Sequence, residues 1–213
     1  MRIQMLDAVE LAQKQQGVTL LELMIATAIL GIIISVAFPS FSDVGDTQRL
    51  IGATEQLTNH IQQARSEAIT ANRTGYINFN ADGSTTWQYG ISTANNNCSL
   101  AATTPTTANA CVIVVDDGDS TLDPGDGTVD TGDLVLMRFT DADWGDVSLN
   151  DAITGGGSQI TFDPTRGTST SGRLGLVSGN GKRLVIAVSL LGRPSICVPS
   201  NSITTTVGNY SAC

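Results

Sequence analysis

The densest group of side chains that could do chemistry is a run of aspartates between residues 116 and 133. Calcium takes about six to eight oxygen ligands, and carboxylates are among those it prefers. The EF-hand pattern does not match, because it needs a closing glutamate and this stretch contains none. Two interpretations stay open, a calcium-binding loop and a solvated acidic turn. The aspartates are Asp116, Asp117, Asp119, Asp123, Asp126, Asp130 and Asp133.

Motifs for catalysis are missing from the rest of the sequence. The single histidine, His60, argues against a Ser–His–Asp triad and against a zinc site built from His and Cys. It lies beside an apolar helical stripe, and we interpret it as a surface or boundary residue. There is no Walker loop, GxSxG, HExxH or GxGxxG with a following helix. The sequence therefore predicts that the chain is not an enzyme, and it predicts no cofactor apart from calcium in the acidic stretch.

Charge is unevenly distributed along the chain, whose net charge is −9. From Asp82 to Asp151 there are twelve aspartates and one basic residue, Arg138. After Asp163 there are basic residues and no acidic ones. The middle of the chain would therefore repel nucleic acid, whereas the C-terminal part could tolerate it. The basic residues after Asp163 are Arg166, Arg173, Lys182, Arg183 and Arg193.

Four cysteines fall into two pairs that are local in the sequence. None belongs to a CxxC motif, and four cysteines allow three connectivities, between which the sequence alone does not choose. Locality favours Cys98–Cys111 and Cys197–Cys213, each of which would close a polar loop. Paired cysteines indicate an oxidising compartment such as the periplasm, and four free thiols in the cytosol are the alternative.

An apolar run near the N-terminus is long enough for a membrane span. Val18–Phe38 has 21 residues, which at about 1.5 Å per residue cover roughly the hydrocarbon thickness of a bilayer. Glu22 lies near the start of this run, and placing an unpaired carboxylate inside a membrane costs roughly several kcal/mol of free energy. If the chain is cut after Gly17, the new amine at Val18 lies one helical turn from Glu22. An amine of the same or a neighbouring chain could then neutralise that carboxylate, whereas a plain signal anchor is the alternative.

This segment resembles a known signal. Gly17 followed by VTLLELMIATAILGIIISVAFPSF is similar to the class III signal of type IV pilins and type II secretion pseudopilins. The resemblance implies that a prepilin peptidase cleaves after Gly17 and methylates Val18, and that Glu22 pairs with the N-terminus of the adjacent filament subunit. It also implies a kink or melted segment at Pro39. Two features depart from the pattern, because Val18 replaces the usual phenylalanine and Lys14 alone supplies the basic charge beside the glycine.

The elements that position these residues follow from hydrophobic periodicity. Beyond Pro39, apolar residues recur at three- and four-residue spacing, which predicts an amphipathic helix whose stripe covers a sheet. After Arg73 the period becomes two, which predicts a small, mostly antiparallel β head. The stripe is Leu50, Ala53, Leu57, Ile61, Ala64 and Ala68, and the predicted strands are Tyr76–Asn80, Thr86–Ile91, Val112–Val115, Leu134–Phe139, Gln159–Asp163 and Arg183–Ser189.

Later segments are similar to the GspH/FimT family, which comprises the H-type minor pseudopilins and their FimT-like pilin relatives. LTNHIQQARSEAITANR resembles the helix of that family, VIVVDDGDSTLDPGDGTVDTGDLVLMRF its strand, acidic turn and strand, and ITFDPTRG and LVIAVSLLGRPSIC its closing strands. The implied fold is α+β and pilin-like, a long N-terminal hydrophobic helix packed on a small antiparallel β-sheet or sandwich head. The expected organisation is a leader at 1–17, a transmembrane and filament-core helix at 18–39, an amphipathic helix at 40–73 and a periplasmic head at 74–213.

Two functions follow from this resemblance. The first is an H-type minor pseudopilin of type II secretion, held in the bacterial inner membrane by one span with its head in the periplasm until it joins the pseudopilus. Its partners would be other pseudopilins, the prepilin peptidase and the inner-membrane assembly platform. The alternative is a FimT-like minor pilin that assists assembly of type IV pili and binds DNA during natural transformation.

The segment LGRPSIC bears on this choice. FimT-like pilins that bind DNA carry a GRxRx motif, of which Gly192 and Arg193 match, but Ser195 replaces the second arginine. Because phosphate binding is additive in cations, the loss of one weakens it. We therefore favour the type II secretion assignment. Under the alternative, the DNA contacts would be Arg193, Arg183 and Lys182.

Overall fold

The structure is a computed structural model that describes residues 17–80, 86–115, 133–151, 158–200, 202 and 207–213. Contacts divide the chain into two compact units, Met1–Ser42 and Asp43–Cys213. We call the second unit the head. One helix, α1 (Leu20–Thr70), contributes to both units. Of the predicted leader, only Gly17 lies within the described residues.

The helix α1 begins after a residue that caps it. The Glu22 N–H donates to Thr19 Oγ1 over 3.2 Å, and the Leu23 N–H donates to the Thr19 carbonyl over 3.1 Å. The two helices expected at 18–39 and 40–73 form one element, which is helical through Pro39, and the kink at that residue stays a prediction. Within the described residues, no helix combines the length and apolar character needed to cross a membrane.

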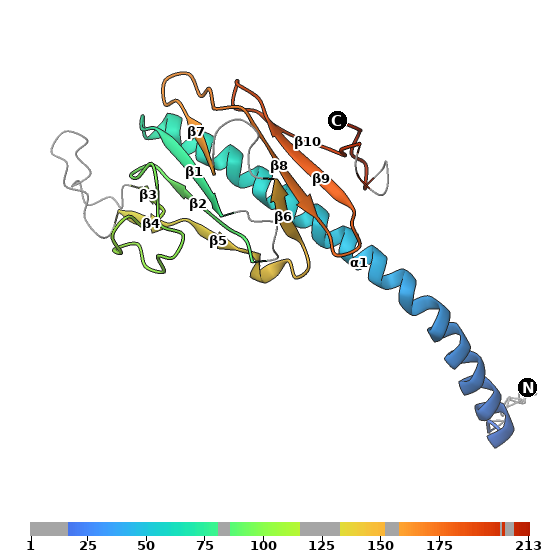
Figure 1. Ribbon diagram of the computed structural model, residues 1–213. Helices are drawn as coiled ribbons and strands as arrows, with labels where there is room; N and C mark the ends of the chain where they lie inside the picture. The colour runs from blue at the N-terminus through green and yellow to red at the C-terminus, as the bar shows by residue number, and fades with distance from the viewer. Residues whose placement is uncertain (1–16, 81–85, 116–132, 152–157, 201, 203–206) are drawn as a thin grey trace, which may run out of the picture. The chain divides into compact units, whose positions relative to one another are not determined.

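The described part of the head contains two four-stranded sheets and a two-stranded ribbon, and the strands within each pair antiparallel (Figure 1). The first sheet has the strand order β5-β2-β1-β7, the second β10-β9-β8-β6, and the ribbon pairs β3 with β4. A short 3-10 helix, η1 (Asp141–Asp143), follows β5. The strands are β1 (Gly75–Asn80), β2 (Gln88–Ser92), β3 (Val112–Val114), β4 (Leu134–Leu136), β5 (Arg138–Thr140), β6 (Ser148–Asp151), β7 (Gln159–Phe162), β8 (Gly172–Val177), β9 (Arg183–Val188) and β10 (Pro194–Cys197).

The predicted α+β fold is confirmed, and the apolar stripe of α1 forms part of its core. All six stripe residues are buried, together with inward-facing side chains of both sheets such as Phe162 and Ile186. Small residues let the helix approach β1 closely. A Cβ added to Gly75 would lie 2.8 Å from the Ala68 Cβ and 3.0 Å from the Ala64 carbonyl oxygen. Only glycine fits at this seam between helix and sheet.

One predicted strand is wrong, and three strands were not predicted. The run Leu134–Phe139 is divided at Met137 because its two halves pair with different neighbours, β4 with β3 and β5 with β2. Met137 spans the change: its N–H donates to the Cys111 carbonyl, and its carbonyl accepts the Ile91 N–H. The strands that periodicity missed are β6, β8 and β10.

Both disulfides favoured by locality are present, Cys98–Cys111 and Cys197–Cys213. The first closes the segment between β2 and the ribbon, where Asn78 Nδ2 donates to Cys98 Sγ over 3.1 Å. The second ties Cys213 to the end of β10, and Val207 and Tyr210 of this C-terminal loop pack on the core. Tyr210 also donates a hydrogen bond of 2.6 Å to Glu55 of α1. Each cross-link therefore attaches an irregular loop to the regular part of the head.

Candidate functional site

The first candidate surface is the N-terminal part of α1. Glu22 lies in the first helical turn, three residues after its cap Thr19, which is the spacing of a capping box. A carboxylate is stabilised there by the unpaired N–H groups of the helix start. Glu22 is exposed on this chain, so its carboxylate is accessible to a partner.

Around Glu22 the helix is apolar on all sides, and large apolar side chains are exposed. A helix of this kind is stable only where lipid or other helices cover it. This surface therefore predicts that the helix associates with lipid or with other helices. The exposed side chains are Val18, Leu20, Leu21, Leu23, Met24, Ile25, Ile29, Leu30, Ile32, Ile33 and Ile34.

A cluster of polar contacts attaches the first turn of α1 within the head to the turn between β8 and β9. Lys182 Nζ lies 2.8 Å from Asp43 Oδ2 and 2.8 Å from Thr47 Oγ1, and Asn180 Nδ2 donates to Asp43 Oδ1 over 2.5 Å. The hydrogen bond from Lys182 holds the pKa of the Asp43 carboxyl below its usual range. The turn between β8 and β9 is preorganised, because Gly181 has a φ of 81° and its N–H donates to the Ser178 carbonyl.

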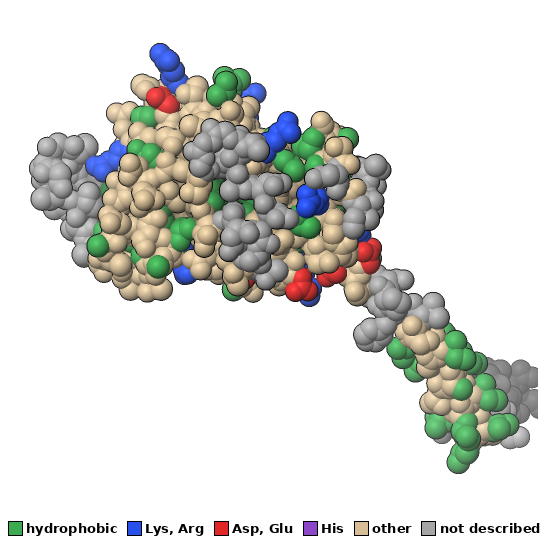
Figure 2. Space-filling model, viewed as in Figure 1, with side chains coloured by type: hydrophobic (Ala, Val, Ile, Leu, Met, Phe, Trp, Pro, Cys, Tyr) green, Lys and Arg blue, Asp and Glu red, His purple; other side chains and the backbone are tan. Residues whose placement is uncertain are grey.

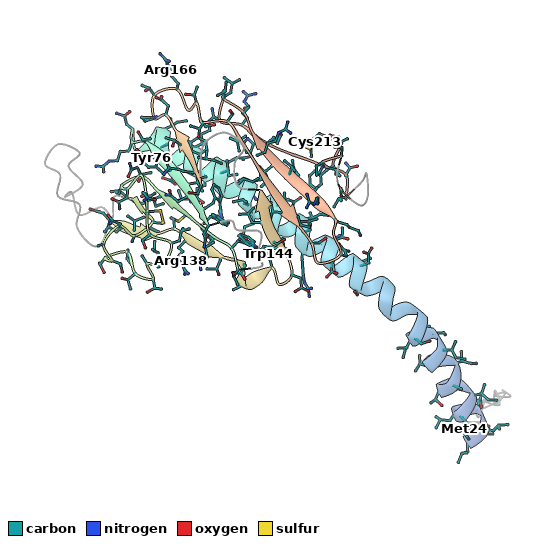
Figure 3. All side chains as sticks on the ribbon, viewed as in Figure 1. Met24, Tyr76, Arg138, Trp144, Arg166 and Cys213 are labelled. Carbon is teal, nitrogen blue, oxygen red and sulfur yellow. A yellow bond between two sulfur atoms is a disulfide. The ribbon has the colours of Figure 1, made fainter. Side chains whose placement is uncertain are left out.

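A second candidate surface is a groove of about 440 Å³ between α1 and the start of β10. Arg65 lines it from the helix, and Arg193 lines it from the turn between β9 and β10. Figure 2 shows hydrophobic and basic side chains, with an acidic one beside them, along the upper edge of the head, near Arg166 as labelled in Figure 3. The lining residues are Gln62, Arg65, Ser66, Ile69, Gly192, Arg193 and Pro194.

Two glycines seat the Arg65 guanidinium in this groove. Arg65 Nε donates to the Gly167 carbonyl over 2.9 Å. Gly167 and Gly192 have φ values of +60° and +72°, a conformation that costs other residues energy. A Cβ on Gly192 would lie 2.9 Å from Arg65 Nε and would overlap the Gly167 carbonyl oxygen. Gly192 of the LGRPSIC segment is therefore required by close packing around Arg65.

The turn that contains Gly167 is stabilised by the side chain of Asp163, which lies in the same turn. Asp163 Oδ1 accepts the N–H groups of Arg166 and Thr165 over 2.8 Å and 2.9 Å. The hydrogen bond from the Arg166 backbone, more than any other contact, lowers the pKa of the Asp163 carboxyl. This carboxylate is thus engaged within its own turn.

A third cluster surrounds His60. Its ring stacks on Phe139 with centroids 3.9 Å apart, and its Nδ1 lies 2.7 Å from the buried Tyr89 hydroxyl. Burial lowers the pKa of His60 and raises that of Tyr89. His60 is half-buried, as a boundary residue should be. Its aromatic partners lie on β2 and β5, and sequence reasoning missed them because they are distant in the chain.

The structure does not bring the predicted DNA contacts together. Lys182 is paired with Asp43, and its side chain is only 16% exposed. Lys182 and Arg183 lie at the start of β9, whereas Arg193 lies beyond its end, so a six-residue strand separates them. At about 3.3 Å per residue, this strand alone spans roughly 20 Å.

The acidic stretch lies almost wholly outside the described residues. Of its aspartates only Asp133 is described, and it is buried. Within the described parts of the chain, no three His, Cys, Asp or Glu side chains are grouped so that they could hold a metal ion. The calcium interpretation therefore stays a prediction.

Two family models match the chain. The model of the Type II transport protein GspH covers residues 53–192, which is more than half of the sequence. The chain belongs to the GspH family. The model of the prokaryotic N-terminal methylation motif covers residues 12–38, which confirms that the segment around Gly17 resembles a prepilin signal. The GspH family consists of structural subunits that assemble with other pilins into filaments, and this N-terminal motif marks a membrane-anchored chain with a periplasmic head.

The solved structures to which this chain is similar include two crystal forms of the type IV minor pilin FimU from Pseudomonas aeruginosa strain PAO1. Both are 20% identical to this chain, with TM-scores of 0.40 and 0.41. They cover 68% and 70% of this GspH-family chain, which corresponds to 90% and 88% of their own. No curated protein matches the chain significantly.

Proposed function

We propose that this chain is an H-type minor pseudopilin, a structural subunit of the periplasmic pseudopilus of a type II secretion system. The observation that carries the proposal is the N-terminal surface of α1. Exposed apolar side chains surround one accessible carboxylate, Glu22, five residues after the glycine of a matched methylation motif. Such a helix requires a bilayer before assembly and neighbouring helices after it.

In this proposal the prepilin peptidase cleaves after Gly17 and methylates the new N-terminus at Val18. The N-terminal part of α1 then holds the chain in the inner membrane as a single span, with the head in the periplasm. Glu22 pairs with the N-terminal amine of an adjacent subunit, because an ion pair offsets part of the cost of a lone carboxylate in apolar surroundings. The assembly platform would extract the chain into the filament.

Glu22→Ala tests the assembly role. We expect the variant to be cleaved after Gly17 and to stay in the membrane fraction, but to be absent from sheared filaments. Glu67→Ala, which removes a carboxylate from the head end of α1, is the matched control and should be incorporated normally. N-terminal sequencing of the mature chain should begin at methylated Val18. Normal incorporation of Glu22→Ala would remove the basis for the role of its carboxylate.

The alternative is a FimT-like minor pilin of type IV pili that binds DNA. The missing second arginine at Ser195 and the pairing of Lys182 with Asp43 support the secretion assignment over it. Deletion in the native bacterium distinguishes the two. A pseudopilin mutant should retain its exported enzymes in the periplasm and transform normally, whereas a FimT-like mutant should secrete normally and lose DNA uptake.

A further inference from the structure

The groove lined by Arg65 and Arg193 has no role in the assembly contact proposed for Glu22. We propose that Arg65 and Arg193 form a clamp for carboxylates, and that the clamp binds an acidic segment on the head of a neighbouring filament subunit. This inference rests on the proposed function, because a neighbour exists only if the chain joins a filament. The groove lies on the head, far along α1 in sequence from Glu22, so it would supply a contact separate from the helix core.

The groove is preorganised for an anion. The Arg65 Nε hydrogen bond to the Gly167 carbonyl and the close packing of Gly192 fix the guanidinium, while most of its N–H donors are not used by that bond. The backbone of Arg193 is fixed in turn, because the Ser189 N–H donates to its carbonyl over 3.1 Å. A fixed guanidinium loses little entropy on binding and suits two-point recognition of a carboxylate.

Neither arginine of the groove forms an ion pair with another described residue. The same is true of Arg166. Asp163, an acid of the adjoining turn, accepts hydrogen bonds from backbone N–H groups of that turn. Two cations with uncommitted donors in one groove attract a carboxylate more strongly than scattered surface charges do, because their fields add at one point.

The surroundings favour a protein segment over nucleic acid. Leu190 and Leu191, which precede Gly192 in the same turn, are 66% and 63% exposed, and Ile69 on the groove wall is 45% exposed. A peptide can cover such apolar side chains while its carboxylates reach the arginines. A nucleic acid needs a longer run of cations and aromatic side chains for its bases, and none of the described residues that line the groove is aromatic.

Fluorescence anisotropy of the full chain in detergent micelles tests the clamp. The probe is a labelled peptide with the sequence of residues 116–133 of this chain, which carries seven aspartates, and its twin has every Asp replaced by Asn. We expect the acidic peptide to bind and the Asn twin to bind at least about tenfold more weakly. Arg65→Gln and Arg193→Gln should each weaken binding of the acidic peptide by about tenfold or more, the effect of losing a charge-assisted hydrogen bond.

The matched control is Arg173→Gln, which removes an exposed arginine of β8 that does not line the groove and should leave binding unchanged. Because Arg65→Gln also removes a structural hydrogen bond, Arg193→Gln carries the test, and an unchanged melting temperature confirms its fold. Equal binding of both peptides, equal loss in Arg173→Gln, or binding of a single-stranded oligonucleotide but not of the acidic peptide would each overturn the proposal. If Glu22→Ala blocks assembly while the acidic peptide fails to bind, the proposed function is supported and the proposed carboxylate clamp is wrong.

Discussion

Replacing Gly192 by alanine should destabilise the head by about 3 kcal/mol. A left-handed conformation costs a residue with a Cβ about 1–2 kcal/mol, and Gly192 has a φ of +72°. The new Cβ would also overlap the Gly167 carbonyl oxygen and lie 2.9 Å from Arg65 Nε. Forcing an atom into closely packed surroundings costs about a further 1–3 kcal/mol. Alanine also lowers the conformational entropy of the unfolded chain, which stabilises the folded head. This gain is only about 0.4–1 kcal/mol and offsets a small part of the two costs.

Gly145 provides a control that separates these two contributions. Its φ is +57°, but nothing lies within 4 Å of an added Cβ. Gly145→Ala should therefore show the conformational cost alone, about 1 kcal/mol. The remaining difference of about 2 kcal/mol between the variants measures the close contact with Gly167 and Arg65. In a unit of this size that difference corresponds to about 4–8 °C in melting temperature.

Urea unfolding of a head beginning at Asp43, with both disulfides intact, measures these differences. The two tryptophans, Trp87 and Trp144, lie in the head and report unfolding by fluorescence. Equal destabilisation by Gly192→Ala and Gly145→Ala would refute the packing argument. It would mean that the turn moves away from Gly167 at little cost and that Arg65 is not held in the groove as described.

Other predictions concern the cross-linked loop and the histidine. Joint replacement of Cys197 and Cys213 by serine should lower stability by about 3 kcal/mol, the value expected for a loop of roughly this length. Wild-type head treated with a reductant should show a larger loss in its urea midpoint, because the reductant also breaks Cys98–Cys111. Because burial lowers the pKa of His60 below 6.5, the unfolded chain binds a proton more readily. Stability should therefore fall as pH drops below about 6.5, and His60→Gln should flatten that part of a melting-temperature profile against pH. An unchanged slope in the variant would assign the effect to other groups.

Much of the head could be predicted from the sequence because its signals are local. The stripe from Leu50 to Ala68 has a helical period, and burial of all six side chains confirms it. The cysteine pairs are close in sequence, so locality was enough to favour the right connectivity. The strand β9 alternates between buried and half-buried residues, and such alternation can be read directly.

The failures have physical causes that are not local. The strand β8 contains Gly172 and Gly175, which weaken its apolar pattern, and its position depends on pairing with β6 and β9. The run at Leu134–Phe139 looks continuous, yet Met137 lies where it passes from one partner to another. At the groove, Arg65 bonds to the Gly167 carbonyl although the two residues are 102 positions apart in the sequence. No spacing rule connects residues that only the folded chain places together.

The seam between α1 and Gly75 has a mechanical consequence. Where the Ala64 and Ala68 positions meet a glycine, the helix and β1 are separated by little more than backbone contact. Such close packing is barely compressible, because it has no side-chain layer that can change rotamers under load. A pull along the helix would therefore be transmitted to the sheet as shear with almost no slack. Gly75→Ala would force the helix and β1 apart at this joint, because the added Cβ would lie 2.8 Å from the Ala68 Cβ.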